Sequence, residues 1–255
     1  ILVVAAFLLG GFGVWAWLTF ARAKPDQNVV PPTQPQRHTI VVDANGGDES
    51  VRDLEAAVER LPKTGNVRIL VKDVVIQAAN IQINVRNVTI EAEPGKRLNW
   101  KAPAKVSTDS KSLLRLASAE GFQLKGCDFD AGNRIDSVIS LYNSCPGLVL
   151  DDLTFKDWRK HAISIDNCEG LPDRPIELKN LKFLSANAKQ SAILFNINPF
   201  FPKILVNQHF VITGCDFQGP GARIVIPKAA IAKPPKGVFF DNVRIEPPIV
   251  PVEEP

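Results

Sequence analysis

The sequence predicts an all-β protein, a parallel β-solenoid that begins with a capping helix and follows one transmembrane helix. Three observations predict this fold. An eight-residue apolar template occurs six times, one slot of every copy holds Asn, Asp or Gly, and residues 1–21 carry no charge. Apolar residues at every second position indicate half-buried strands, and a template that recurs along the chain indicates stacked repeats.

Residues 1–21 form the predicted transmembrane helix. Seventeen of them are apolar, and a helix of this length crosses a bilayer core of about 30 Å. Trp15 and Trp17 lie near its end, where aromatic rings favour the headgroup region, so the lipid bilayer is an expected partner. The alternative is a signal peptide cleaved after Ala23, although its apolar core would be unusually long. Positive charge follows on one flank only, which leaves the orientation open.

Proline marks both ends of the predicted folded domain. Residues 22–38 hold four prolines, a composition that favours extended polyproline conformations, and we expect a linker there. Residues 246–255 hold four more prolines and are expected to form a disordered tail. The β-solenoid domain is therefore predicted to span residues 39–245.

One helix is predicted at the start of this domain. Ser50 is the expected N-cap, an apolar stripe runs from Val51 to Leu61, and Pro62 and Gly65 end the helix. Such a helix would cover the core that the first repeat exposes, and a solenoid needs this protection against end-on association.

The template reads apolar-x-apolar-x-x-apolar-x-apolar. All 24 of its apolar slots hold Val, Ile, Leu, Phe or Cys. The six copies are INVRNVTI (83–90), FQLKGCDF (122–129), LVLDDLTF (148–155), IELKNLKF (176–183), FVITGCDF (210–217) and VFFDNVRI (238–245). Two strands joined by two residues must change direction if both apolar pairs are to face one core.

The second of the two joining residues is expected to make the corner. It is always a type that tolerates left-handed backbone angles: Asn87, Gly126, Asp152, Asn180, Gly214 and Asn242. A single left-handed residue lets the chain wind onward, whereas a hairpin usually needs an Asn-Gly or Gly-x pair. Further apolar runs, at 138–143, 161–167, 191–196 and 222–227, predict about three strands per repeat. Leucine-rich repeats and a β-sandwich are the alternatives, disfavoured by repeat length and by the shortage of hairpin signals.

From about residue 39 to residue 245 the chain resembles the parallel β-helix proteins of the pectin lyase-like superfamily. The resemblance rests on the corner template and on TIVVDANGGDESVRDLEAAVERLP (39–62), which is similar to the strand, Gly-rich turn and capping helix that begin pectinesterase-like domains. It implies a right-handed β-helix and an extracytoplasmic location. The layout of anchor, spacer and sensor-like domain also resembles the C-terminal half of bacterial membrane-bound serine/threonine kinases. Because the chain contains no Met, we expect it to be a C-terminal fragment.

Enzymes of this family use one strand face and the loops beside it. The corresponding candidates for catalysis are Asp130, Asp157, Lys160, His161 and Asp166, with Arg134 and Asp136 close by in sequence. Because stacked strands lie about 4.8 Å apart, carboxylates on adjacent repeats could flank a sugar bond or hold Ca²⁺, and a lysine could remove a proton. The competing interpretation is a solvated polar loop with ordinary ion pairs.

The candidates for ligand contact are Trp158, Arg159, Phe200 and Phe201, with loop anchoring as the alternative for the aromatic residues. No group of His and Cys residues has the spacing of a metal site, so we expect no metal or other cofactor. Ca²⁺ would be a cofactor only if the protein were the alternative lyase or hydrolase. Cys145 and Cys168 follow similar runs on adjacent repeats, which leaves a disulfide and a pair of buried thiols both open.

These observations favour a binding function without catalysis. The polygalacturonase-like motifs of the family and the pectinesterase signatures are absent, and a net charge of +3 with interspersed signs argues against nucleic acid. We expect a membrane-anchored sensor, binding or interaction module for a polysaccharide or protein ligand, with a kinase as the expected preceding part. The alternative is a cell-surface polysaccharide lyase or glycoside hydrolase.

Overall fold

The computed structural model describes residues 37–46, 50–63, 65–73, 75–107, 111–196, 207–226 and 238–239. The chain divides into two units, Ile1–Pro35 and Gln36–Pro255, and every described residue belongs to the second. The expected transmembrane helix, nearly all of the linker and the Pro-rich tail lie outside the described residues. Among the described helical residues, none forms a helix long and apolar enough to cross a membrane.

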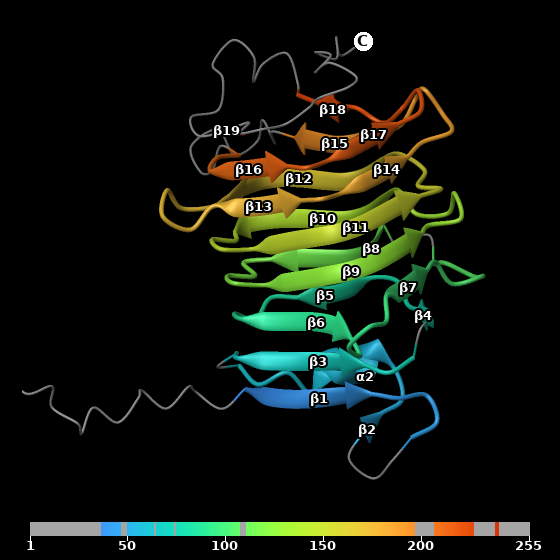
Figure 1. Ribbon diagram of the computed structural model, residues 1–255, viewed down its shortest axis with the longest axis vertical. Helices are drawn as coiled ribbons and strands as arrows, with labels where there is room; N and C mark the ends of the chain where they lie inside the picture. The colour runs from blue at the N-terminus through green and yellow to red at the C-terminus, as the bar shows by residue number, and fades with distance from the viewer. Residues whose placement is uncertain are drawn as a thin grey trace, which may run out of the picture. The chain divides into compact units, whose positions relative to one another are not determined.

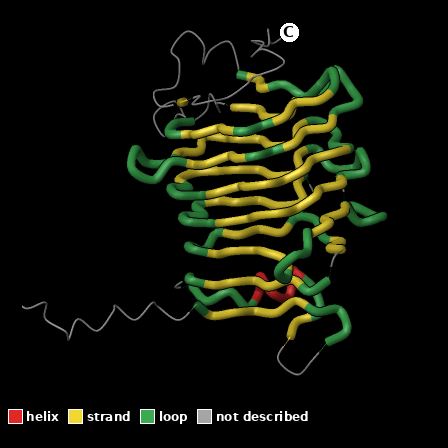
Figure 2. Tube along the Cα trace, in the orientation of Figure 1, coloured by secondary structure: helices red, strands yellow, loops and turns green. Residues whose placement is uncertain are grey.

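The second unit is mostly β-sheet, as the sequence predicts (Figures 1 and 2), and all pairs among its described strands are parallel. The larger sheet contains β1 (His38–Val42), β2 (Ser50–Val51), β3 (Val67–Val71), β4 (Val75–Gln77), β6 (Val88–Ala92), β7 (Leu98–Lys101), β9 (Gln123–Asp130), β11 (Val149–Lys156), β13 (Ile176–Lys179), β14 (Lys182–Leu184), β16 (Phe210–Thr213), β17 (Asp216–Gln218) and β19 (Val238–Phe239). The smaller sheet contains β5 (Ile81–Ile83), β8 (Ser112–Ala117), β10 (Ser137–Ser144), β12 (His161–Glu169), β15 (Ser191–Asn196) and β18 (Ile224–Val225).

The template register is confirmed by the aromatic residues of its last slot. Phe129, Phe155, Phe183 and Phe217 are successive cross-strand partners, and their rings stack with centroids 5.0–5.2 Å apart. Trp100 begins this column, 5.4 Å from Phe129. The column lies within one apolar core to which both sheets contribute buried side chains. The apolar runs between the templates are also strands, namely β10, β12, β15 and β18.

The corner residues adopt the expected left-handed backbone. The φ angles of Gly126, Asp152, Asn180 and Gly214 lie between 52° and 64°, and Asn87 has φ 53°. Asn242 lies outside the described residues. Each corner therefore turns the chain without reversing it, because the strands on both sides of it pair in parallel with the next repeat.

The first template copy does not share the register of the others, contrary to the sequence prediction. Ile90, its last apolar residue, pairs with Leu124 in the first half of the next copy. The second half of that layer is supplied by β7 instead, where Trp100 pairs with Phe129. The sequence of β7, LNWK, contains only two apolar residues, whereas the eight-residue template needs four. The template therefore did not predict this strand.

The helix α2 (Leu54–Glu59) is shorter than predicted and begins later. Asp53 is the N-cap, because its Oδ1 accepts a hydrogen bond of 2.8 Å from the Ala56 amide. Ser50, the predicted cap, lies in β2 and pairs with Val41. Leu54 and Ala57 are buried, and α2 contacts β1, β2 and β5. The helix thus covers the start of both sheets, as expected of a cap.

Candidate functional site

The candidate site lies on the smaller sheet, where β8, β10, β12 and β15 are stacked one above another (Figure 1). Seven side chains on these strands form what we call the polar row: Arg115, Tyr142, His161, Ser164, Asp166, Ser191 and Asn196. Tyr142, Asp166 and Asn196 are successive cross-strand partners. Arg115, Tyr142, Ser164, Asp166 and Asn196 each lie next to a leucine, isoleucine or phenylalanine that is buried in the core. His161 and Ser191 begin β12 and β15 and have the same strand parity as the buried Ile163 and Ile193.

Asp166 occupies the centre of the row. The Ser164 hydroxyl donates to its Oδ2 at 2.8 Å, and the Asn196 amide donates from the next strand to its Oδ1 at 2.6 Å. Asp166 is therefore held in position by two neighbouring strands.

Tyr142 and Arg115 form the next part of the row. The guanidinium carbon of Arg115 lies 4.5 Å from the centroid of the Tyr142 ring, within the range of a cation–π contact. Burial, together with the negative charge of Asp166, raises the pKa of Tyr142 above its ordinary value. The phenol is therefore neutral at physiological pH and retains its proton for hydrogen bonding.

His161 pairs with Ser191 at the other end of the same strands. Its Nδ1 lies 2.7 Å from the Ser191 hydroxyl oxygen. Burial and the positive charge of Lys160 lower the pKa of His161, although Asp166 and Asp136 act in the opposite direction. The imidazole is consequently uncharged at neutral pH.

Asp136, Arg159 and Lys160 form an ion-pair cluster beside His161. Lys160 Nζ lies 3.0 Å from Asp136 Oδ2, and the Arg159 guanidinium pairs with the other carboxylate oxygen. Burial opposes ionisation of Asp136, but the hydrogen bonds from Lys160 and Arg159 outweigh it and lower the pKa. The cluster carries one excess positive charge, and Arg159, a predicted ligand contact, is engaged in it.

The structure brings only some of the predicted catalytic residues together. Lys160 and Asp166 lie near enough to His161 for the charge of each to affect its pKa. Asp130 lies at the end of β9 in the larger sheet, where it pairs with Lys156 at 3.1 Å. Asp157 has a left-handed backbone with φ 54°, and its carbonyl accepts a hydrogen bond from the Asn133 amide. Asp130 therefore forms an ion pair between neighbouring strands, and Asp157 supplies a left-handed residue and a backbone acceptor at a turn.

Trp158, a candidate for ligand contact with loop anchoring as its alternative, lies where the alternative would place it. Its side chain is completely buried and meets Phe183 edge-on, with ring centroids 6.5 Å apart. The Trp158 ring thus packs beside the aromatic column, where burial of a large ring stabilises the core more than exposure would. Phe200 and Phe201 lie outside the described residues.

The sequence did not single out Arg115, Tyr142, Ser164, Ser191 or Asn196 as site residues. A signal was present, because the runs ISLY (139–142), ISID (163–166) and ILFN (193–196) align residue for residue and place Tyr142, Asp166 and Asn196 in one column. The sequence alone does not show which side chains of such a column form hydrogen bonds with one another, because this depends on their conformations and on the distances between strands.

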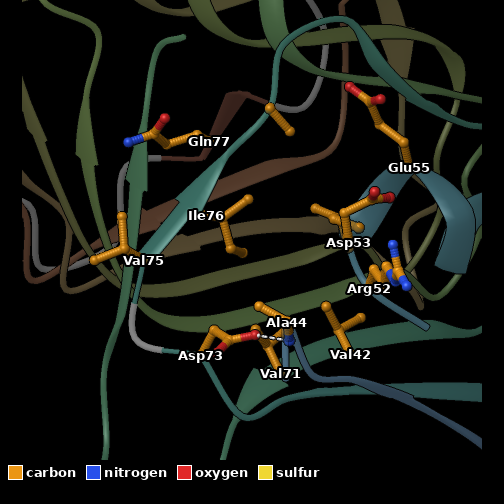
Figure 3. Close-up of a pocket in the computed structure, with 12 residues that line it drawn as sticks. Val42, Ala44, Arg52, Asp53, Glu55, Val71, Asp73, Val75, Ile76 and Gln77 are labelled. Atoms are coloured by element: carbon orange, nitrogen blue, oxygen red, sulfur yellow. Dashed lines mark hydrogen bonds between the residues drawn. The ribbon is translucent and has the colours of Figure 1, made fainter. Parts of the chain in front are cut away.

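A separate pocket of about 230 Å³ lies at the start of the unit (Figure 3). Val42, Val71 and Ile76 line its apolar part, and Asp53 and Asp73 lie at its edge. Figure 3 shows β4 on one side and the beginning of α2 on the other. Both carboxylates already accept backbone hydrogen bonds, Asp53 from Ala56 and Asp73 from Ala44. These groups therefore stabilise the turn and the helix cap.

Within the described ranges, no three His, Cys, Asp or Glu side chains come together in a way that could hold a metal ion. Comparison of the chain with protein-family models, with curated proteins and with solved structures gives no match.

Proposed function

We propose that residues 39–245 form a right-handed parallel β-helix that binds an extended polysaccharide along the polar row and catalyses no reaction. In this proposal residues 1–21 anchor the chain in a membrane and the β-helix is displayed outside the cytoplasm. Parallel pairing of each repeat with the one before and the one after it supports the β-helix. The apolar, charge-free character of residues 1–21 supports the anchor.

The observation that carries the binding function is the column formed by Tyr142, Asp166 and Asn196. The three side chains stand on consecutive strands, about 4.8 Å apart, and offer a neutral hydroxyl, a carboxylate and an amide. A polysaccharide that crosses the strands presents hydroxyl groups as both donors and acceptors at comparable intervals. The mutual hydrogen bonds of the row hold its side chains in place before the ligand arrives, which lowers the entropic cost of binding.

The hydrogen bonds and ion pairs that already engage these groups argue against acid–base catalysis in the row. A glycosidase needs one carboxyl that keeps its proton near neutral pH. Asp136 has a lowered pKa, and Asp166 accepts hydrogen bonds on both oxygens. Lys160, the candidate base of a lyase, is paired with Asp136.

A polysaccharide lyase or glycoside hydrolase is the second candidate, and one observation favours it. His161 is uncharged at neutral pH and lies within hydrogen-bond distance of Ser191, as a general base must be. However, Ser191 is 4% exposed, and its amide and that of Ala192 donate to the carbonyls of Lys160 and Arg223. These amides are therefore not free to stabilise an oxyanion beside Ser191.

The test measures binding of the full chain to pectate, alginate and a neutral glucan, together with release of oligosaccharides with and without Ca²⁺. We expect at least one polysaccharide to bind without being cleaved. Asp166→Ala should weaken binding about tenfold or more, because a charged hydrogen-bond partner is lost.

Lys182→Ala is the matched control, since Lys182 is an exposed residue of β14 in the larger sheet. This variant should bind like the wild type, and unchanged melting temperatures should show that both variants are folded. Cleavage by the wild type that His161→Ala and Asp157→Asn both abolish would establish the enzyme instead. Equal binding by Asp166→Ala and the wild type would remove the polar row as the site.

A further inference from the structure

Two thiols lie on neighbouring strands next to the polar row. Cys145 directly follows β10, and Cys168 lies in β12, where its cross-strand partner is Asn143. The Cys145 amide donates a hydrogen bond of 2.8 Å to the Glu169 carbonyl, which ties the two segments together at this point. Both cysteines are fully buried and neither is bridged.

The contacts of the pair make the two sulfurs chemically different. A hydrogen bond from Cys168 lowers the pKa of Cys145, and the backbone amides of Ala119 and Ser118 act in the same direction. Burial raises the pKa of Cys168 well above its ordinary value. Cys145 is therefore the thiol that ionises first, and the thiolate is the nucleophile in disulfide exchange.

We propose that Cys145 and Cys168 are a redox pair that closes to a disulfide between neighbouring repeats in an oxidising compartment and remains as two thiols in a reducing one. The pair is independent of the proposed ligand binding, since neither thiol belongs to the polar row. It would, however, lock the end of the strand that carries Tyr142, whose carbonyl accepts a hydrogen bond of 3.4 Å from Cys145 Sγ.

The bond can form by two exchanges with a small disulfide such as oxidised glutathione. The Cys145 thiolate attacks one sulfur of the reagent, which forms a mixed disulfide and releases one glutathione thiolate. Cys168 then loses its proton and attacks Cys145 Sγ, which forms the protein disulfide and releases the second glutathione. Two protein thiols are oxidised, and one disulfide reagent is reduced to two thiols. Because both protein thiols are buried, we expect exchange during folding or after transient opening.

The other two cysteines provide a matched control. Cys127 and Cys215 are also buried, but the cross-strand partner of Cys127 in the next repeat is Leu153, and Cys215 lies two repeats beyond that. A bond between them would need sulfurs that are separated by intervening strands, which disulfide geometry does not allow.

The experiment refolds the full chain in oxidised glutathione, and separately in a reducing buffer, and then alkylates the remaining thiols under denaturing conditions. We expect two alkylated cysteines after oxidation and four after reduction, with peptide mapping that links Cys145 to Cys168. Closing the loop should raise the melting temperature by about 5–10 °C. The double variant Cys127→Ser/Cys215→Ser should still form the bond, whereas Cys145→Ser and Cys168→Ser should each abolish both the bond and the temperature shift.

Four alkylated thiols after oxidative refolding would overturn the proposal, as would a bond that involves Cys127 or Cys215 or a mixed disulfide that persists. Polysaccharide binding, measured on the same reduced chain, reports on the proposed function separately from this result.

Discussion

Charge compensation governs the chemistry of single residues beside the polar row. Asp136 is partly buried, yet it stays ionised because two cations donate to it. His161 lies next to that cluster and has no comparable anionic partner, so burial and Lys160 together favour its neutral form. The same surroundings therefore stabilise the negative charge of Asp136 and disfavour a positive charge on His161.

The lowered pKa of His161 predicts a pH dependence of stability. Below pH 6.5 the unfolded chain binds a proton at this histidine more readily than the folded chain does. The free energy of unfolding should therefore fall as the pH drops from 7 towards 5. His161→Gln, which can still bond to Ser191, should reduce this slope in denaturant titrations at several pH values. His38→Gln, at an exposed position of β1, serves as the control. Equal slopes in the wild type and His161→Gln would contradict the assignment.

At the scale of single elements, the corners decide how the strands of one repeat join. Asn180 stands between β13 and β14 with φ 52°, and its side-chain amide donates to Asp151 Oδ1 at 2.8 Å on the preceding repeat. Its own backbone amide donates to the Thr213 carbonyl on the following repeat. The corner thus connects three repeats, and its conformation is one that β-branched side chains strongly disfavour.

Asn180→Val should therefore lower the free energy of unfolding by about 1–2 kcal/mol. Asn180→Gly should cost less than the valine, because glycine adopts the left-handed conformation without strain. The control is Lys179→Val, at a strand position where β-branched residues are favoured. Chemical denaturation of the three variants measures the differences, and equal losses for Asn180→Val and Lys179→Val would contradict the corner assignment.

At the scale of the whole molecule, stability accumulates from repeat to repeat. The aromatic column runs from Trp100 to Phe217 through the described core, with neighbouring rings in contact at every step. A repeat removed from the middle would expose the faces of its neighbours. The end with β1 and β2 is covered by α2, whose buried residues Leu54 and Ala57 face this core. Cooperative folding of the whole unit follows from such nearest-neighbour contacts.

A chain that spans residues 39–245 should consequently fold by itself. We expect a far-ultraviolet circular dichroism spectrum dominated by β-structure, with little helical signal, because α2 is the single helix among the described residues. A second chain that ends at residue 144 should lose the smaller-sheet strands β12, β15 and β18 and melt at a much lower temperature. A mainly helical spectrum, or equal melting temperatures for the two chains, would contradict this account.

The sequence by itself determined the strand periodicity, the parallel stacking, the corners at Gly126, Asp152, Asn180 and Gly214, and the presence of a cap, because these features depend on local apolar spacing and on backbone preference. Only the tertiary structure decided which segments share a layer. The first template copy and β7 show this. The template would place Ile90 opposite Phe129, but in the structure Ile90 pairs with Leu124, and Trp100 of β7 pairs with Phe129.

In the polar row, too, the sequence determines some features and the tertiary structure determines others. The types and order of Tyr142, Asp166 and Asn196 are written in the sequence, and their common column follows from the repeat. The hydrogen bonds that tie Asp166 to two strands, the burial of Trp158 and the partner of His161 are set by distances between residues far apart in the chain. Burial and pairing are properties of the assembled core, and for that reason local sequence patterns do not reveal them.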